Sequence, residues 1–117
     1  MADKPLLWLG SSRAYVRLFP EDARSAAGFQ LRRIQQGLDP NDWKPMPTVG
    51  PGVREIRIHV EGAHRVFYVA SFPEAVYVLH AFDKKTRRTS AQDLELGRKR
   101  FRDLVEMRRE RGTKERT

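Results

Sequence analysis

Two arginines in consecutive strand-like segments are well placed to bind an anion. Arg57 lies in VREIRIHV and Arg65 in HRVFYVAS, and both segments alternate in a way that puts apolar side chains on one face. Neighbouring strands lie about 4.8 Å apart, so guanidinium groups on adjacent strands could converge on one anion, such as a phosphodiester. The alternative is that each arginine is a separate surface residue lying along the sheet.

A second basic group follows the next apolar segment. The stretch AVYVLHAFDKKTRRTS starts as a strand that is apolar on both faces and then reaches Lys84, Lys85, Arg87 and Arg88. Three strands in sequence therefore deliver cations to one region. We expect Lys84 and Lys85 to act with the two strand arginines on a phosphate.

Two histidines are candidates for moving a proton near neutral pH. His80 lies inside the apolar segment, where a hydrogen-bonded core histidine is the commoner explanation. His59 shares a strand face with Arg57 and is the second candidate. Neither comes with the spacing of metal ligands, so we expect no metal site and no cofactor.

Several further residues are candidate RNA contacts. Phe82 lies beside the lysines and could stack on a base, although core packing is the commoner role of such a residue. Arg98 belongs to a charged helical face that adjoins the basic stretch but is more often only solvated surface. The complete set of expected RNA-binding residues is Arg54, His59, Phe82, Arg87, Arg88 and Arg98.

The net charge of +8 is unevenly distributed along the 117 residues. Residues 1–83 contain 10 basic and 9 acidic residues, whereas residues 84–117 contain 13 and 6, a net charge of +7. Such a field attracts polyanions, among them RNA, DNA, an anionic membrane or an acidic protein. The alternative is a solvated tail. No cysteine is present, which suits a reducing cytoplasm, and we expect no signal peptide and no membrane span.

The elements that must position these residues can be predicted from periodicity and punctuation. In chain order we expect a strand over 4–9, helices over 13–19 and 20–37, an irregular loop over 39–52, strands over 53–60, 64–71 and 75–82, and a final helix capped by Thr89 or Ser90. The tail from Glu106 onward should fray. This order predicts a single α+β domain over 1–117, in which an N-terminal strand, two helices and a C-terminal helix pack with an antiparallel sheet.

Several segments together resemble a known family. WLGSSRAYVRLFP, KPM at 44–46, GPGVREIR, HRVFYVA and VYVLHAFDKKT are similar to the phage-derived branch of the RelE/HigB toxins, over about residues 4–104. The resemblance implies a RelE/ParE-type fold and the toxin of a type II toxin–antitoxin pair. Such toxins are usually mRNA endonucleases (mRNA interferases) acting at the ribosome in the cytoplasm. It also implies a HigA-like helix-turn-helix antitoxin as partner, in a hetero-oligomer with the toxin.

The resemblance implies cleavage without metal, in which the 2′-hydroxyl is the nucleophile. Arg65 matches the strand arginine that stabilises the phosphate in this family, and Arg57 falls near a position that often holds lysine. Lys84 and Lys85 match the basic pair after the last strand. The family's C-terminal tyrosine is absent, because no tyrosine follows Tyr77. The general base is therefore open among His80, His59 and a lysine of lowered pKa.

Two alternatives belong to other functional classes. ParE-like relatives share the fold and are thought to inhibit DNA gyrase by binding alone, but such chains usually lack the two lysines at the end of the strand. A noncatalytic module that binds RNA or DNA is the third reading. Arg57, Arg65, His80, Lys84 and Lys85 carry the catalytic hypothesis.

Overall fold

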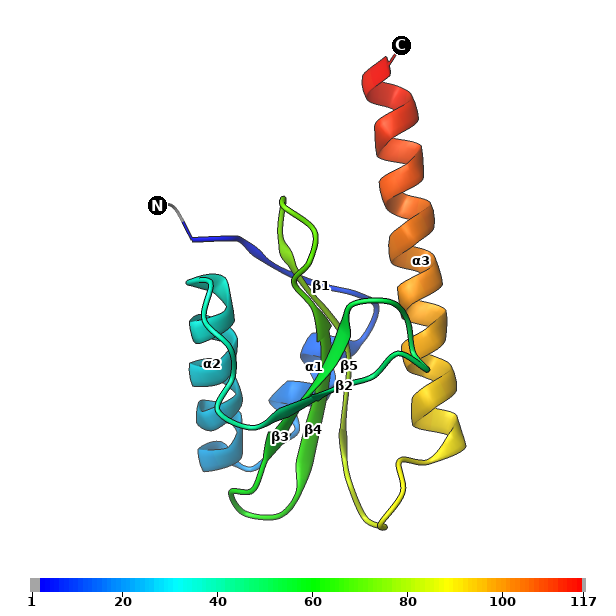
Figure 1. Ribbon diagram of the computed structural model, residues 1–117. Helices are drawn as coiled ribbons and strands as arrows, with labels where there is room; N and C mark the ends of the chain where they lie inside the picture. Colours follow the sequence, from blue (N-terminus) through cyan, green and yellow to red (C-terminus); the bar gives the residue numbers. More distant parts are fainter. Residues whose placement is uncertain (1–2, 117) are drawn as a thin grey trace.

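The computed structural model describes the backbone of residues 3–116 and the side chains of residues 3–112 (Figure 1). Within that range the chain forms one sheet of five strands and three helices, as the α+β prediction requires. The strands are β1 (Leu6–Trp8), β2 (Trp43–Pro45), β3 (Val53–Ile58), β4 (His64–Val69) and β5 (Val76–Asp83). The helices are α1 (Ser12–Arg17), α2 (Glu21–Gln35) and α3 (Ala91–Arg116).

The sheet has the strand order β1-β5-β4-β3-β2. The predicted antiparallel meander of β3, β4 and β5 is present. The sheet is not wholly antiparallel as predicted, because β1 pairs with β5 in parallel, with Leu6 opposite Val76. The N-terminal strand can pair in this direction because α1, α2 and the meander separate it from β5 in the sequence.

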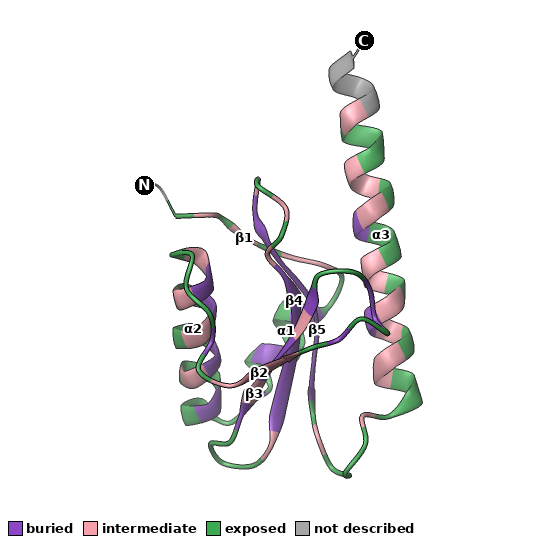
Figure 2. Cartoon of the chain, in the orientation of Figure 1, coloured by how far each residue is buried: buried purple, intermediate pink, exposed green. Residues whose placement is uncertain are grey.

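Helices cover both faces of the sheet, and their buried sides face it (Figure 2). On one face Ile56, Tyr68 and Val78 pack with Ala23 and Leu31 of α2. The opposite face packs against α3 through a second group of buried side chains, which includes Val53, Phe67, Val69, Tyr77, Leu79 and Leu104. β5 is buried on both faces for this reason, as its continuous apolar sequence predicts.

Gly97 allows α3 to approach the sheet closely. A Cβ atom at this position would lie 2.8 Å from the Phe67 ring and 3.2 Å from Val49. Both distances are shorter than ordinary van der Waals contact, so a side chain here would push the helix outward. The glycine therefore sets how near the helix comes to β4.

The loop predicted over 39–52 was wrong in part, because β2 lies within it. Its residues pair with β3, with Trp43 opposite Ile56 and Pro45 opposite Arg54. Sequence periodicity missed this strand because it is only three residues long. Proline is tolerated there because β2 is an edge strand.

The backbone of α3 continues as a helix past Glu106, to Arg116. Arg108 fixes the helix to the turn between β4 and β5 through a bidentate ion pair with Glu74. At its start α3 is capped as predicted by Ser90, whose Oγ accepts the backbone N–H of Asp93 at 3.0 Å. No helix within the described residues is long and apolar enough to cross a membrane.

Candidate functional site

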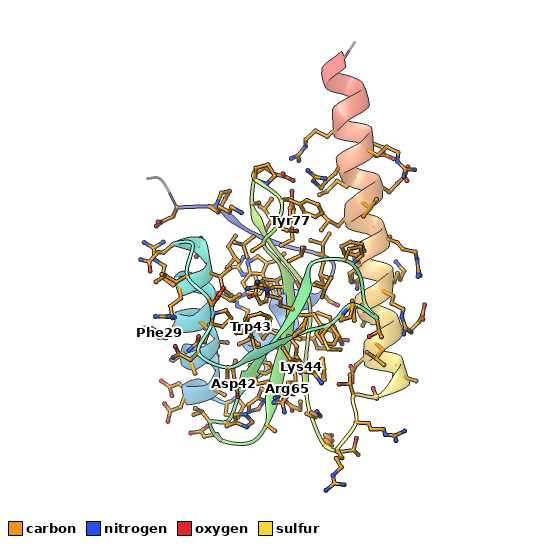
Figure 3. All side chains as sticks on the ribbon, viewed as in Figure 1. Phe29, Asp42, Trp43, Lys44, Arg65 and Tyr77 are labelled. Carbon is orange, nitrogen blue, oxygen red and sulfur yellow. The ribbon has the colours of Figure 1, made fainter. Side chains whose placement is uncertain are left out.

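Arg57 and Arg65 lie directly opposite each other on two adjacent strands of the sheet. They are direct partners in the register of β3 and β4, and Phe82 of β5 is the next partner of Arg65. Lys44 of β2 pairs with Glu55 of β3, so it joins the same face from the edge strand. Figure 3 shows Lys44 and Arg65 lying toward one end of the sheet, near Asp42. The two predicted arginines are thus brought together.

Glu55 lies at the centre of these cations and is fully buried. Its Oε1 is 3.6 Å from Nε of Arg57, 3.6 Å from Nε of Arg65 and 4.0 Å from Nζ of Lys44. Within the described residues, neither its carboxylate oxygens nor the two Nε atoms have a hydrogen-bond partner. Charge rather than hydrogen bonding therefore links Glu55 to the two arginines, whose Nε atoms are buried with it.

Arg65 is a buried arginine of this group, with 6% of its surface exposed. Its Nη1 donates to the carbonyl of His64 at 3.0 Å, which fixes the direction of the guanidinium. Burial lowers the pKa of Arg65, the Glu55 carboxylate raises it, and the positive charge of Arg57 lowers it further. Even so, an arginine stays protonated, so Arg65 is a fixed positive charge.

Lys84 belongs to the same electrostatic environment. Its backbone N–H donates to Ala63 at 2.8 Å, which holds the start of the loop beside β4. The pKa of Lys84 is lowered by burial and then by the positive charge of Arg65, while Glu55 acts in the opposite direction. We call Lys44, Arg57 and Arg65, which gather around Glu55, together with the neighbouring Lys84, the cation cluster. Lys85 follows it and is exposed.

His59 lies beside the cation cluster, just beyond the end of β3. Its side chain is 61% exposed, and Nε2 lies 3.1 Å from Oδ2 of Asp42. The carbonyl of Asp42 in turn accepts the backbone N–H of Arg57 at 2.9 Å. An accessible imidazole with a carboxylate partner therefore stands next to the strand arginines.

His80 has the opposite character, because it is buried, with 3% of its surface exposed. Its Nε2 lies 2.8 Å from Oδ1 of Asp93, so it is the hydrogen-bonded core histidine that sequence considerations favoured. Burial lowers the pKa of His80, and the bond to Asp93 opposes that change. Its ring stacks on Phe82 with centroids 5.3 Å apart, and Phe82 also packs on Phe67.

The structure does not bring all predicted RNA contacts to the cluster. Arg54 belongs to the face that packs against α2, where it pairs with Asp39 at 2.9 Å and lies over Trp43 at 3.9 Å. Arg98 donates to the carbonyl of Thr48 at 2.8 Å. Arg87 and Arg88 are exposed in the loop between β5 and α3, and Arg88 lines a pocket there with Lys85.

Glu55 and Lys44 were not assigned to the site from the sequence. Glu55 falls on the same strand face as Arg57, and this alternation was the signal that could have placed it among the cations. Lys44 was noticed only as part of KPM, because the strand that carries it was not predicted. Within the described residues, no group of three or more histidine, cysteine, aspartate or glutamate residues could hold a metal ion.

The sequence matches a known protein family. The model of the phage-derived protein Gp49-like family (DUF891) matches residues 14–102, most of the chain. The protein belongs to this family. The Gp49-like family is a RelE/HigB-like toxin family, which implies an antitoxin partner. No curated protein matches the chain significantly.

The matched range contains β3, β4, β5 and the start of α3. The Gp49-like region therefore includes the whole cation cluster and both candidate histidines. It also includes the loop with Lys85, Arg87 and Arg88.

Proposed function

We propose that this Gp49-like protein is the toxin of a type II toxin–antitoxin pair and a metal-independent endoribonuclease that cuts ribosome-bound mRNA. The cation cluster is the observation that carries the proposal. Arg57, Arg65 and Lys84 surround one region of the sheet, with an exposed histidine beside them. Cleavage of RNA without a metal ion needs such fixed positive charges and a group that moves protons.

In the proposed reaction the 2′-hydroxyl oxygen attacks the adjacent phosphorus. The bond from phosphorus to the 5′ oxygen of the next nucleotide then breaks. A base takes the proton of the 2′-hydroxyl, and an acid gives a proton to the departing 5′ oxygen. The products are a 2′,3′-cyclic phosphate and a 5′-hydroxyl, so atoms and charge balance without an external oxidant or cofactor.

The strand arginines stabilise the negative charge of the phosphorane. The Arg57 side chain is 33% exposed, so its guanidinium can donate to phosphate oxygens when RNA is bound, and the buried Arg65 adds a fixed positive charge behind it. Arg65 is the buried, immobile member, and Arg57 is its more accessible neighbour. Lys84 and Lys85 complete the positive field on the side of the loop.

His59 is the histidine that we assign to proton transfer. It is exposed and lies beside Arg57, whereas His80 is buried and its Nε2 is engaged by Asp93. Lys84 is the second group that can exchange a proton, because its pKa is lowered by burial and by the neighbouring cations. Asp42 lies 3.1 Å from Nε2 of His59 and orients its ring.

The basic residues of the C-terminal region would hold the toxin to ribosomal RNA. Such contacts neutralise phosphates and release counterions, so binding should weaken steeply as salt increases. A co-transcribed antitoxin, HigA-like and with a helix-turn-helix, would neutralise the protein in a hetero-oligomer.

The proposal is tested by inducing the protein in cells and mapping the 5′ ends of RNA. New 5′-hydroxyl ends inside translated frames are expected with the native chain. The double variant Arg65→Ala, Lys85→Ala should remain folded and give none of them. Intact message with DNA damage would instead support gyrase inhibition, and binding without new ends would support a noncatalytic module. Cleavage that persists in the double variant would overturn the site assignment.

A further inference from the structure

A pocket of about 470 Å³ lies at the end of β5, beside the cation cluster. Its lining includes Tyr15 of α1, His80 and Phe82 of β5, Lys84 of the following loop and Gln92 of α3. In Figure 1 this loop turns at the end of the sheet before it enters α3. Lys84 belongs to the cation cluster, and Phe82 of the pocket is the strand partner of Arg65, so the pocket adjoins the cluster.

Aromatic rings form one side of the pocket. His80 and Phe82 stack with their planes 21° apart, and Tyr15 meets the His80 ring edge-on at 5.4 Å. Tyr15 is 39% exposed, which leaves much of its surface open to a ligand. His80 and Phe82 are buried behind it, so Tyr15 is the ring on which an unpaired base can stack.

The polar lining divides into groups that the protein already uses and groups that remain accessible. Asp93 bonds to His80 through Oδ1 and to the Ser90 hydroxyl through Oδ2, at 2.8 and 2.6 Å. These bonds lock the His80 ring in place. The side chains of Gln92 and Lys85 are exposed, and an amide offers both a donor and an acceptor to the edge of a base.

We propose that this pocket binds one unpaired RNA base next to the phosphate held by the cation cluster. The identification of the base as part of a cleaved RNA rests on the proposed function. The volume falls within the range of roughly 300–1,000 Å³ usual for sites of small organic ligands. Aromatic, amide and ammonium groups together match a base joined to a phosphate, whereas a bare sugar phosphate would leave the aromatic side unused.

Nucleotide titration followed by NMR tests the pocket without requiring cleavage. The probes are AMP, CMP and ribose 5-phosphate added to the full-length protein. AMP or CMP should shift the ring signals of Tyr15 and His80 and bind about tenfold more tightly than ribose 5-phosphate. The comparison of AMP with CMP shows whether a purine or a pyrimidine is preferred.

Tyr15→Ala should lower the affinity for the preferred nucleotide about tenfold and leave the affinity for ribose 5-phosphate unchanged. The matched control is Phe29→Ala, which removes an exposed aromatic side chain on α2, on the other side of the sheet from α3 (Figure 3). It should leave both affinities unchanged. Equal affinities for the three probes, or ring signals of Tyr15 and His80 that do not move in the native protein, would overturn the inference.

The outcomes separate this inference from the proposed function. Nucleotide binding at Tyr15 with no RNA cleavage in cells would overturn the nuclease proposal and keep the pocket. Cleavage in cells with no nucleotide response at Tyr15 and His80 would keep the nuclease and overturn the pocket. If nucleotide binding and RNA cleavage are both observed, Tyr15→Ala should change the distribution of bases beside the cut. An unchanged distribution would count against the inference.

Discussion

Glu74 and Glu55 are both carboxylates that face arginines, but their surroundings differ. Glu74 accepts two hydrogen bonds from Arg108, at 2.7 and 3.2 Å, and a third from the Tyr77 hydroxyl at 2.7 Å. Glu55 has two arginines at 3.6 Å and no hydrogen bond within the described residues. Figure 3 shows the two regions toward opposite ends of the sheet, marked by Tyr77 and Arg65.

The difference separates a structural ion pair from a site that can accept a ligand. At Glu74 the partners satisfy each other, and the Arg108 hydrogen bonds lower the pKa of Glu74 to about 2. Arg108 also lies over the Phe72 ring at 3.8 Å, so the pair joins α3 to the sheet. At Glu55 one carboxylate faces two arginines, so a net positive charge remains, and the partly exposed Arg57 can still meet an added phosphate.

The largest expected effect is on catalysis. Arg65→Ala should reduce the rate of mRNA cleavage by about 10²–10³, because a preorganised donor to the transition state is lost. Arg108→Ala removes an arginine from the satisfied pair and should change the rate by no more than about twofold, since its effect falls on stability. The measurement is single-turnover cleavage of a defined mRNA on purified ribosomes. Equal losses in both variants would end the functional contrast between the two regions.

The next effect is on stability and its dependence on pH. Because the folded pKa of Glu74 is below its ordinary value of 4.5, its contribution is present above about pH 4.5 and disappears as the pH falls toward 2. Glu74→Gln should lower the free energy of unfolding by about 1–2 kcal/mol at pH 7, allowing for solvent screening. Urea denaturation at several pH values should show a smaller loss of stability between about pH 5 and 2 in the variant.

A matched control for this prediction lies on α3. Glu106 pairs with Arg109 at 3.5 Å, and its side chain is 59% exposed. Glu106→Gln should change stability by less than about 0.5 kcal/mol, as is usual for a surface pair. A comparable loss in the control would show that general charge, and not the bonded pair, explains the result at Glu74.

The smallest effect sharpens the contrast at Glu55. Glu55→Gln removes the charge that raises the pKa of Lys84, so this pKa should fall further, as NMR titration of the lysine can measure. RNA binding should become more dependent on salt, and the slope of log K against the logarithm of the salt concentration should be steeper by up to about 0.7. Glu95→Gln is the control, because it makes the same change in net charge at an exposed site on α3. An identical response in both variants would contradict a specific role of Glu55 in the cluster.

Long regular patterns in the sequence predicted most of the fold. The alternation in β3 and β4 placed Arg57 and Arg65 on one face, and the continuous apolar run identified β5 as a central strand. β2 was missed because three residues carry no periodic signal, and the parallel pairing of β1 was missed because it depends on distant residues. The helical tail of α3 was missed because contacts such as Arg108 with Glu74 are tertiary.

The candidate site was predicted less completely than the fold, for a similar reason. Residue types and strand faces identified the arginines and lysines. The choice between the two candidate histidines depended on burial, because His80 is hydrogen-bonded to Asp93 in the interior while His59 is exposed. Glu55 in the midst of the cations follows from the register between three strands, which a single sequence does not contain.

The parallel pairing of β1 with β5 has a consequence for synthesis. Leu6 cannot find its partner Val76 until the ribosome has released nearly the whole sheet, and closing so long a segment is slow. Lys84, the last member of the cluster, follows the same late strand. The first strand of a nascent chain therefore stays unpaired until β5 emerges, and Lys84 joins Lys44, Arg57 and Arg65 only after β2, β3 and β4 have been made.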